Sequence, residues 1–356
     1  MARNPIVDIF RVKELRERIL FTVGMLLIFR LGATIPVPGV DVNAVAAQWS
    51  GPAGGGQSVV EYLDFFTGGA FSEVSVFMLG IMPYISMSII MQLLLLVFPA
   101  LKRISEEDGG RKKIQKYTRY GTLVICVVQS FAVLNTVNPS ALRIGTIPFF
   151  FLATLTLSAG TMFLMWIGEQ INQRGIGNGI SLIIFAGIVA RLPQGVWALI
   201  QAVQNDQANP VLVILVLALF VGVVALVIYE QRGQRKIPVH YAKRVVGRRV
   251  MQAPNTYIPF KINPSGVIPV IFAMSVLTFP LSLLQGLAQD VGWIRGLLTA
   301  LAPGRPWYLI TYTLLIVFFA YFYTQVTLNP MEISRRIREA GGSIPGIRSE
   351  NMEEYL

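Results

Sequence analysis

The chain contains two matching stretches, Gly80-Ile81-Met82-Pro83-Tyr84-Ile85 and Gly266-Val267-Ile268-Pro269-Val270-Ile271. Both follow the pattern Gly-apolar-apolar-Pro-x-Ile, and each lies near the start of a long apolar segment. A proline inside a helix removes a backbone hydrogen bond and bends the helix axis, whereas a glycine lets another backbone approach closely. In a membrane protein, matching segments interrupted by Gly and Pro indicate an internal repeat whose working site lies between the two halves.

The composition is typical of a membrane protein. Of the 356 residues, 54% are hydrophobic and 14% are charged, whereas soluble domains carry about 25% charged residues. A helix needs about 20 apolar residues to cross a bilayer core. The sequence therefore predicts an all-α polytopic membrane protein with eight spans, at residues 19–36, 74–99, 120–137, 147–168, 178–198, 210–229, 264–286 and 306–328. The only cysteine, Cys126, lies in the third span, which excludes a disulfide framework and favours a packing role.

Lys and Arg residues are distributed unevenly between the two sides of these spans. Of the 30, 25 precede span one, follow spans two, four and six, or lie in the tail after span eight. The other loops hold only Arg143, Arg191, Arg295 and Arg305, and Arg30 lies inside span one. Because positive residues concentrate in cytosolic loops, we expect both termini in the cytosol. The basic cytosolic face suits anionic lipids or an acidic partner such as RNA or an acidic protein surface.

One apolar stretch is too short to span. It reads Val59-Val60-Glu61-Tyr62-Leu63-Asp64-Phe65-Phe66, lies on the outward side, and has glycines before and after it. About ten residues cannot cross a bilayer core of about 30 Å. The stretch is either a short helix on the outer surface or a segment that folds back between the spans, with the glycines as hinges.

The spans contain few groups suited to solute transport or catalysis. A transporter places convergent polar or charged groups near the midplane, but Arg30 is nearly alone at depth and is expected to snorkel or to satisfy carbonyl groups. Gln92 and Gln129 are isolated amides, which more often join helices, and His240 lies in a cytosolic loop. The sequence shows no phosphate-binding loop and no nucleophile–base set. It therefore predicts no enzyme, no metal site and no cofactor.

What the spans do contain is isoleucine at helical spacing. Three pairs lie three or four residues apart, so that each pair shares one helix face: Ile81 and Ile85, Ile180 and Ile184, and Ile268 and Ile271. Such stripes usually belong to a packed core, but their place beside the repeated pattern favours a second interpretation. A ring of aliphatic side chains closes a pore by excluding water, and it fits around an extended chain of any sequence.

Several longer strings match one known family, in that family's order. They are Thr34-Ile35-Pro36-Val37-Pro38-Gly39, residues 80–86, Arg174-Gly175-Ile176-Gly177-Asn178-Gly179-Ile180-Ser181, Gly233-Gln234-Arg235-Lys236, Tyr241-Ala242-Lys243-Arg244 and Gly346-Ile347-Arg348. On these strings the chain resembles the SecY family, the central subunits of bacterial protein-conducting channels. It departs from that family at Ser349, where Pro-Gly is usual, and at Leu356, where it ends before two further expected spans.

The resemblance implies an inverted-repeat clamshell with eight of ten expected transmembrane helices. The halves would be residues 1–209, with spans one to five, and residues 210–356, with spans six to eight. It further implies a passive channel for secretion across, and insertion into, the bacterial cytoplasmic (inner) membrane. SecE and SecG would be its small membrane partners, the SecA ATPase or the ribosome its drivers, and signal peptides and unfolded preproteins its cargo.

The same resemblance implies roles for individual residues. The isoleucines would form the pore ring, with Ile268 at its edge. Residues 57–70 would be the plug, including Tyr62, Leu63, Phe65 and Phe66. Spans two and three would part from spans seven and eight as a lateral gate, where Gln92, Gln129 and Phe279 lie. Loops 230–263 and 329–356 would dock SecA or the ribosome through Arg235, Lys236, Lys243, Arg244 and Arg348.

A competing interpretation is a secondary transporter for a small solute. Inverted repeats and broken helices fit both kinds of protein. The distinguishing feature is the site between the repeats, where a transporter needs polar groups and this chain has isoleucines.

Overall fold

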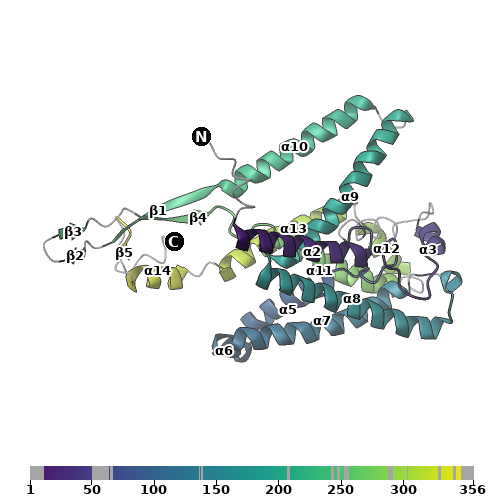
Figure 1. Cartoon of the computed structure of the whole chain (residues 1–356), viewed down its shortest axis with the longest axis horizontal. Helices are drawn as coiled ribbons and strands as arrows, with labels where there is room; N and C mark the ends of the chain where they lie inside the picture. The colour runs from purple at the N-terminus through teal and green to yellow at the C-terminus, as the bar shows by residue number, and fades with distance from the viewer. Residues whose placement is uncertain are drawn as a thin grey trace. The chain divides into compact units, whose positions relative to one another are not determined.

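A computed structural model of the chain describes residues 12–49, 64, 67–135, 137, 139–206, 209–241, 244–246, 249–251, 256–287, 292–302, 304–327, 330–339 and 342–345. Its helices are α2 (Lys13–Ala33), α3 (Val42–Trp49), α5 (Met82–Val97), α6 (Pro99–Glu106), α7 (Gly110–Leu134), α8 (Thr146–Arg174), α9 (Gly179–Gln204), α10 (Pro210–Arg232), α11 (Ile268–Leu287), α12 (Gly292–Ala300), α13 (Pro306–Thr327) and α14 (Pro330–Glu339) (Figure 1). A 3₁₀ turn, η1, covers Pro139–Ala141. The strands are β1 (Gln234–Tyr241), β2 (Arg244–Val246), β3 (Arg249–Met251), β4 (Thr256–Lys261) and β5 (Gly342–Ser343).

The chain divides into two compact units. The first comprises Met1–Ile200 and Phe272–Thr313, and the second comprises Gln201–Ile271 and Leu314–Leu356. In the first unit, α7 packs along α8 and α5, and α2 packs along α8. Its core includes Cys126 of α7 and Phe149, Ala153 and Leu157 of α8, none of which has an exposed surface. The packing role predicted for Cys126 is thereby confirmed.

The segment from Thr67 to Ile81 forms turns that are buried in this unit. The backbone N–H of Val37 donates to the carbonyl of Val74 at 2.9 Å, and the N–H of Val76 donates to the carbonyl of Ile35 at 2.9 Å. The expected span at residues 74–99 is therefore wrong at its start, because the helix begins only at Met82. Apolar composition alone did not reveal these turns, since their side chains are buried as those of a helix would be.

The two matching stretches have the same local geometry. Gly80 and Gly266 have φ angles of +56° and +57°, a region that favours glycine, and each lies two residues before a helix start. Pro83 and Pro269 occupy the second position of α5 and α11, where the missing N–H has no partner to lose. The expectation that these prolines bend a helix is therefore wrong, because they begin one.

The sharp bend near the second expected span lies at its other end. Helices α5 and α6 meet at 102°, with Phe98 between them. Phe98 has extended backbone angles of φ −105° and ψ 104°, as expected for a residue that precedes a proline. Pro99 then begins α6.

Eight spans are not confirmed by length and composition. In the part of the chain that the structure describes, five helices are long and apolar enough to cross a membrane, namely α7, α8, α9, α10 and α13. The bent pair α5 and α6 makes a sixth if it is one span. The first and seventh expected spans fall on α2 and α11, which do not meet that test.

Polar side chains fix the short connection between α8 and α9. The Oδ1 of Asn178 accepts from the N–H of Ile180 at 3.1 Å, which caps the first turn of α9. The Oδ1 of Asn172 accepts from the N–H of Gly179 at 2.7 Å, and the Oγ1 of Thr22 accepts from the N–H of Ile176 at 3.1 Å. These hydrogen bonds show the structural role of residues 174–181, which is to fix the connection between α8 and α9.

The second unit contains a sheet that hydropathy did not predict. Strands β1 and β4 pair antiparallel from Gln234↔Lys261 to Val239↔Thr256, and β5 pairs with the end of β1 (Figure 1). Ile237 and Val239 of β1 are buried with Ile337 of α14 and Ile344. The expected loop 230–263 is therefore largely a β-ribbon, because alternate side chains on β1 face this small core.

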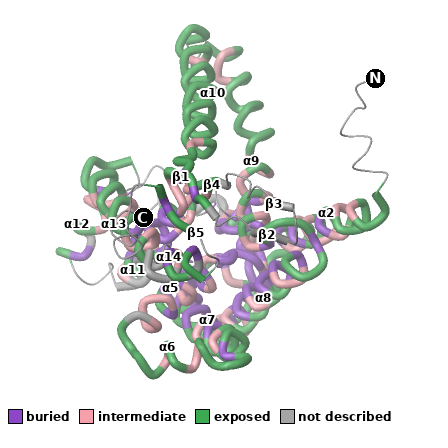
Figure 2. Tube along the Cα trace, turned by 90° about the vertical axis from the view of Figure 1, so that its left-hand side faces the viewer, coloured by how far each residue is buried: buried purple, intermediate pink, exposed green. Residues whose placement is uncertain are grey.

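Helix α10, also in the second unit, buries none of its side chains over its whole length (Figure 2). It is the most apolar of the candidate spans, with a mean hydropathy of 3.5. Such a helix requires lipid or another apolar partner around it.

Candidate functional site

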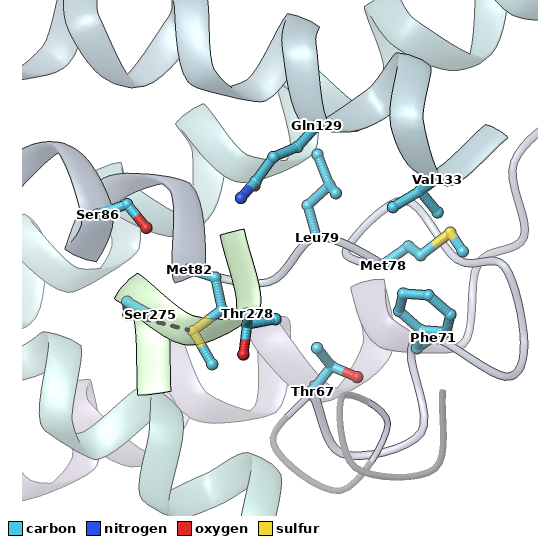
Figure 3. Close-up of a pocket in the computed structure, with 10 residues that line it drawn as sticks. All are labelled: Thr67, Phe71, Met78, Leu79, Met82, Ser86, Gln129, Val133, Ser275 and Thr278. Atoms are coloured by element: carbon cyan, nitrogen blue, oxygen red, sulfur yellow. Dashed lines mark hydrogen bonds between the residues drawn. The ribbon is translucent and has the colours of Figure 1, made fainter. Parts of the chain in front are cut away.

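A small cavity lies in the first unit where α5, α7 and α11 meet the turns of residues 67–80. Its volume is about 30 Å³, which holds water but not an extended polypeptide. Ten residues line it: Thr67, Phe71, Met78, Leu79, Met82, Ser86, Gln129, Val133, Ser275 and Thr278 (Figure 3). None of these lining residues is charged, so the cavity is apolar with a few hydroxyl groups and one amide.

The polar groups of the cavity come from three helices and, at Thr67, from the segment before α5. Gln129 of α7 extends toward Met82 and Ser86 of α5, opposite Ser275 of α11 (Figure 3). The Oγ of Ser275 lies 3.8 Å from the Sδ of Met82, a weak hydrogen bond between α11 and α5. The Oγ of Ser86 is buried and has no hydrogen-bond partner among the described residues. A buried hydroxyl of this kind is free to bind water or an incoming polar group.

The isoleucines predicted to form a ring lie on α5, α9 and α11 or directly before them. Ile81 and Ile85 are each 5% exposed. Ile180 and Ile184 are half-buried, with Ile180 over Gly168 of α8. Ile268 and Ile271 are half-buried too, but they belong to the second unit. The ring as a whole therefore stays a prediction.

Of the predicted gate residues, the structure brings one into the cavity. Gln129 is 7% exposed and lines it, whereas Gln92 is half-buried on α5 and is not among the lining residues. Phe279 lies on α11, but its side chain is outside the described part. Sequence reasoning missed Ser86, Ser275 and Thr278, because short hydroxyl side chains within apolar helices carry no distinctive pattern.

The predicted plug residues Tyr62, Leu63, Phe65 and Phe66 lie outside the described residues. Five residues within 57–70 are described, namely Asp64, Thr67, Gly68, Gly69 and Ala70, and arginines hold two of them. The Oδ2 of Asp64 accepts from the Nη2 of Arg191 on α9. The carbonyl of Gly68 accepts from the Nη1 of Arg30 on α2 at 2.6 Å, which confirms that Arg30 satisfies a carbonyl.

The structure places Arg191 differently from the sequence-based assignment. It was counted with the loops on the outward side, but it lies inside α9 and its side chain is 28% exposed. No local signal in the sequence pairs Asp64 with Arg191, because Glu61 and Glu73 are further acidic residues of the same stretch.

The basic residues predicted for docking fall on the second unit. Arg235 and Lys236 are exposed on β1, and the Nζ of Lys236 lies 4.8 Å from the ring centroid of Tyr257 on β4. His240 is exposed on β1 as expected. Lys243 and Arg348 lie outside the described residues, and of Arg244 only the backbone in β2 is described.

A model of the SecY family matches residues 75–356. The chain belongs to the SecY family. It is 43% identical over 372 residues to the protein translocase subunit SecY of Vibrio cholerae, covering 100% of this chain and 83% of that protein. It is 46% identical over 354 residues to the protein translocase subunit SecY of Borreliella burgdorferi, covering 98% and 80%.

Solved structures show the same SecY-type fold. One titled "The structure of a protein conducting channel" has a TM-score of 0.65 at 19% identity and covers 99% of this chain and 85% of that one. A second, on the plug domain of a SecY protein that stabilises the closed state, has a TM-score of 0.60 at 19% identity with the same coverage. Sec61 in the canine ribosome–channel complex has a TM-score of 0.58 at 18% identity and covers 99% and 86%.

Proposed function

We propose that this SecY-family chain is the protein-conducting subunit of a translocase in the bacterial cytoplasmic membrane, with its N-terminus in the cytosol. Unfolded preproteins pass through the isoleucine ring, and apolar signal peptides leave sideways between α5, α7 and α11. The chain is passive, so that SecA or a translating ribosome drives the movement. SecE and SecG are its small membrane partners, and anionic lipids contact its basic face.

The observation that carries this proposal is the uncharged cavity between α5, α7 and α11. A weak polar contact across it is the 3.8 Å approach of Ser275 to Met82, and most of the lining surface is apolar. Surfaces held by apolar packing separate without leaving charges unpaired in lipid. An apolar helix entering between them replaces the packing that it disrupts, as a signal peptide would.

A solute transporter fits this cavity poorly. Its lining has no charged group among the described residues, and those residues hold no cluster of three His, Cys, Asp or Glu that could bind a metal. Selective solute binding needs convergent polar ligands. We therefore favour the channel over the transporter and over an enzyme.

The experiment that tests the proposal is site-specific photo-crosslinking. A photoreactive residue replaces Ile184, which is half-buried on α9, and a secretory chain is stalled midway through translocation. We expect crosslinks from position 184 to the stalled chain. The control is position 215 on α10, where Leu215 is 66% exposed, and no crosslinks are expected there. If the complex is active and position 184 does not crosslink, the isoleucines only pack and the conduit lies elsewhere.

The docking surface gives a second prediction. The paired change Arg235→Glu with Lys236→Glu reverses two exposed charges on β1 and removes the contact of Lys236 with Tyr257. We expect SecA or ribosome binding to membranes to weaken at least about tenfold, because like charges in an interface oppose association. Binding is measured by co-sedimentation with vesicles.

The matched control for docking is Lys116→Glu, which reverses an exposed charge on α7 in the first unit. Binding to this variant should equal that of the unsubstituted chain. Equal loss in both variants would mean that net charge, rather than the β1 surface, governs binding.

A further inference from the structure

The turn at Gly68 and Gly69 lies on one face of α9. Both glycines have positive φ, +70° and +100°. A Cβ at position 68 would lie 2.9 Å from the Cα and carbonyl oxygen of Gly187, and one at position 69 would lie 3.0 Å from the Nη2 of Arg191. Because Gly187 and Arg191 are four residues apart, they share one side of the helix. Only a turn without side chains can approach α9 this closely.

Arg191 contacts two residues at the end of the expected plug, Asp64 within residues 57–70 and Ser72 just after them. Its Nη2 donates to the Oδ2 of Asp64 and also to the Oγ of Ser72, at 2.9 Å for the latter. The other carboxylate oxygen of Asp64, Oδ1, accepts from the N–H of Ser72 at 2.8 Å. Both oxygens of Asp64 are thus occupied, and its side chain is only 12% exposed.

Arg30 holds the same turn from another helix. Its Nη1 donates to the carbonyl of Gly68, so that α2 holds this turn while α9 holds Asp64 and Ser72. The group of two guanidinium groups and one carboxylate is partly buried. Moving Asp64 and residues 67–72 away would leave these charges unpaired at the edge of a low-dielectric region, which is strongly unfavourable until water or another partner replaces the contacts.

We propose that Asp64, Arg191 and Arg30 form a latch that holds the end of the plug against α2 and α9 and sets how readily the channel opens. This inference rests on the proposed channel function. Asp64 and Arg191 are positioning residues, since they act by holding the plug segment rather than by touching cargo. The strength of the contacts that these residues make determines how effective a signal peptide must be to open the channel.

The test uses membrane vesicles from cells in which each variant replaces the native chain. Arg191→Gln and Asp64→Asn each remove one charge of the pair. We expect each to raise ion leak at least about threefold and to allow export of a reporter with a weakened signal peptide. The double variant should leak no more than either single variant, because both remove one shared interaction. Arg191→Lys, which keeps the charge, should recover part of the seal.

The matched control is Arg143→Gln. It breaks another Arg–Asp pair of the first unit, Arg143 with Asp41 at 3.4 Å, whose side chains are 69% and 38% exposed. It should change neither leak nor signal stringency. If Arg191→Gln does not accumulate, the nearly isosteric Asp64→Asn decides the question.

Three outcomes would overturn the latch: unchanged leak and stringency in variants that accumulate normally, equal effects of Arg143→Gln, or additive effects in the double variant. Substitution of Ile81 and Ile85 in the same vesicles separates this result from the channel function. If that change raises leak while the latch variants do not, the latch fails and the channel stands. If protein export continues when the chain is depleted, the channel function itself fails.

Discussion

Vesicles that carry Ile81→Ser together with Ile85→Ser are expected to leak ions at least about tenfold faster than vesicles with the unsubstituted chain. Both side chains are 5% exposed at the start of α5, and aliphatic groups at a constriction exclude water and therefore ions. Burying an isoleucine side chain is worth about 1.5–3 kcal/mol, and about 1.4 kcal/mol corresponds to a tenfold change. Two hydroxyl groups in their place would favour water in the closed state.

Halide efflux from the vesicles measures this leak, and export of a reporter with a defective signal peptide measures the accompanying loss of stringency. The control is Ile90→Ser, which introduces the same change on α5 at a position that is 39% exposed. Leak from the control should match the unsubstituted chain. Normal leak and normal stringency in the Ile81 and Ile85 variant would show that these side chains only pack, and the pore ring would have to be assigned elsewhere.

The second large effect is expected at Gly160 on α8. A Cβ at this position would overlap the carbonyl oxygen of Val76, in the turns before α5. Backbone cannot yield as a flexible side chain can, so Gly160→Val forces α8 away from residues 75–77. Overpacking of a core typically costs about 1–3 kcal/mol or more. We expect most of the chain to be degraded, and the remainder to unfold at a lower temperature.

Immunoblotting of membranes and thermal unfolding of the purified chain measure these two quantities. Gly222→Val on α10 is the matched control, because a Cβ there would meet no atom within 4 Å. The control should accumulate and unfold as the unsubstituted chain does. If Gly160→Val behaves like Gly222→Val, the close approach of α8 to residues 75–77 is not a feature of the folded chain.

Hydropathy predicted many of the helices, because the apolar character of a membrane-spanning helix lies in the residues of its own segment. The apolar runs located α7, α8, α10 and α13, and the Gly-Pro pattern identified two sites with matching geometry. It did not predict the turns of residues 67–81, because buried turns and buried helices are equally apolar. It did not predict the ribbon of β1 and β4 either, since its pairing depends on residues distant in the sequence.

The candidate site was harder to predict than the fold. Helical spacing selected the isoleucines, and the family resemblance selected Gln129, which does line the cavity. The contact between Asp64 and Arg191 joins residues 127 positions apart. Neither residue has a local signature, so only the fold shows that they meet. The same holds for Arg119 and Glu169, which form a two-bond ion pair at 3.0 and 2.6 Å between α7 and α8.

The lack of buried residues in α10 has a consequence for how this chain can change over evolutionary time. No residue of Pro210–Arg232 is buried in the part of the chain that the structure describes, so the described neighbours place little constraint on the shapes of its side chains. Natural selection on this helix then acts on its overall hydrophobicity rather than on the identity of each residue. Exchanges among Val, Leu, Ile and Phe are expected to drift there almost freely. Diverging copies of the gene should therefore lose their likeness first along α10, while α8, shaped by its neighbours, still matches.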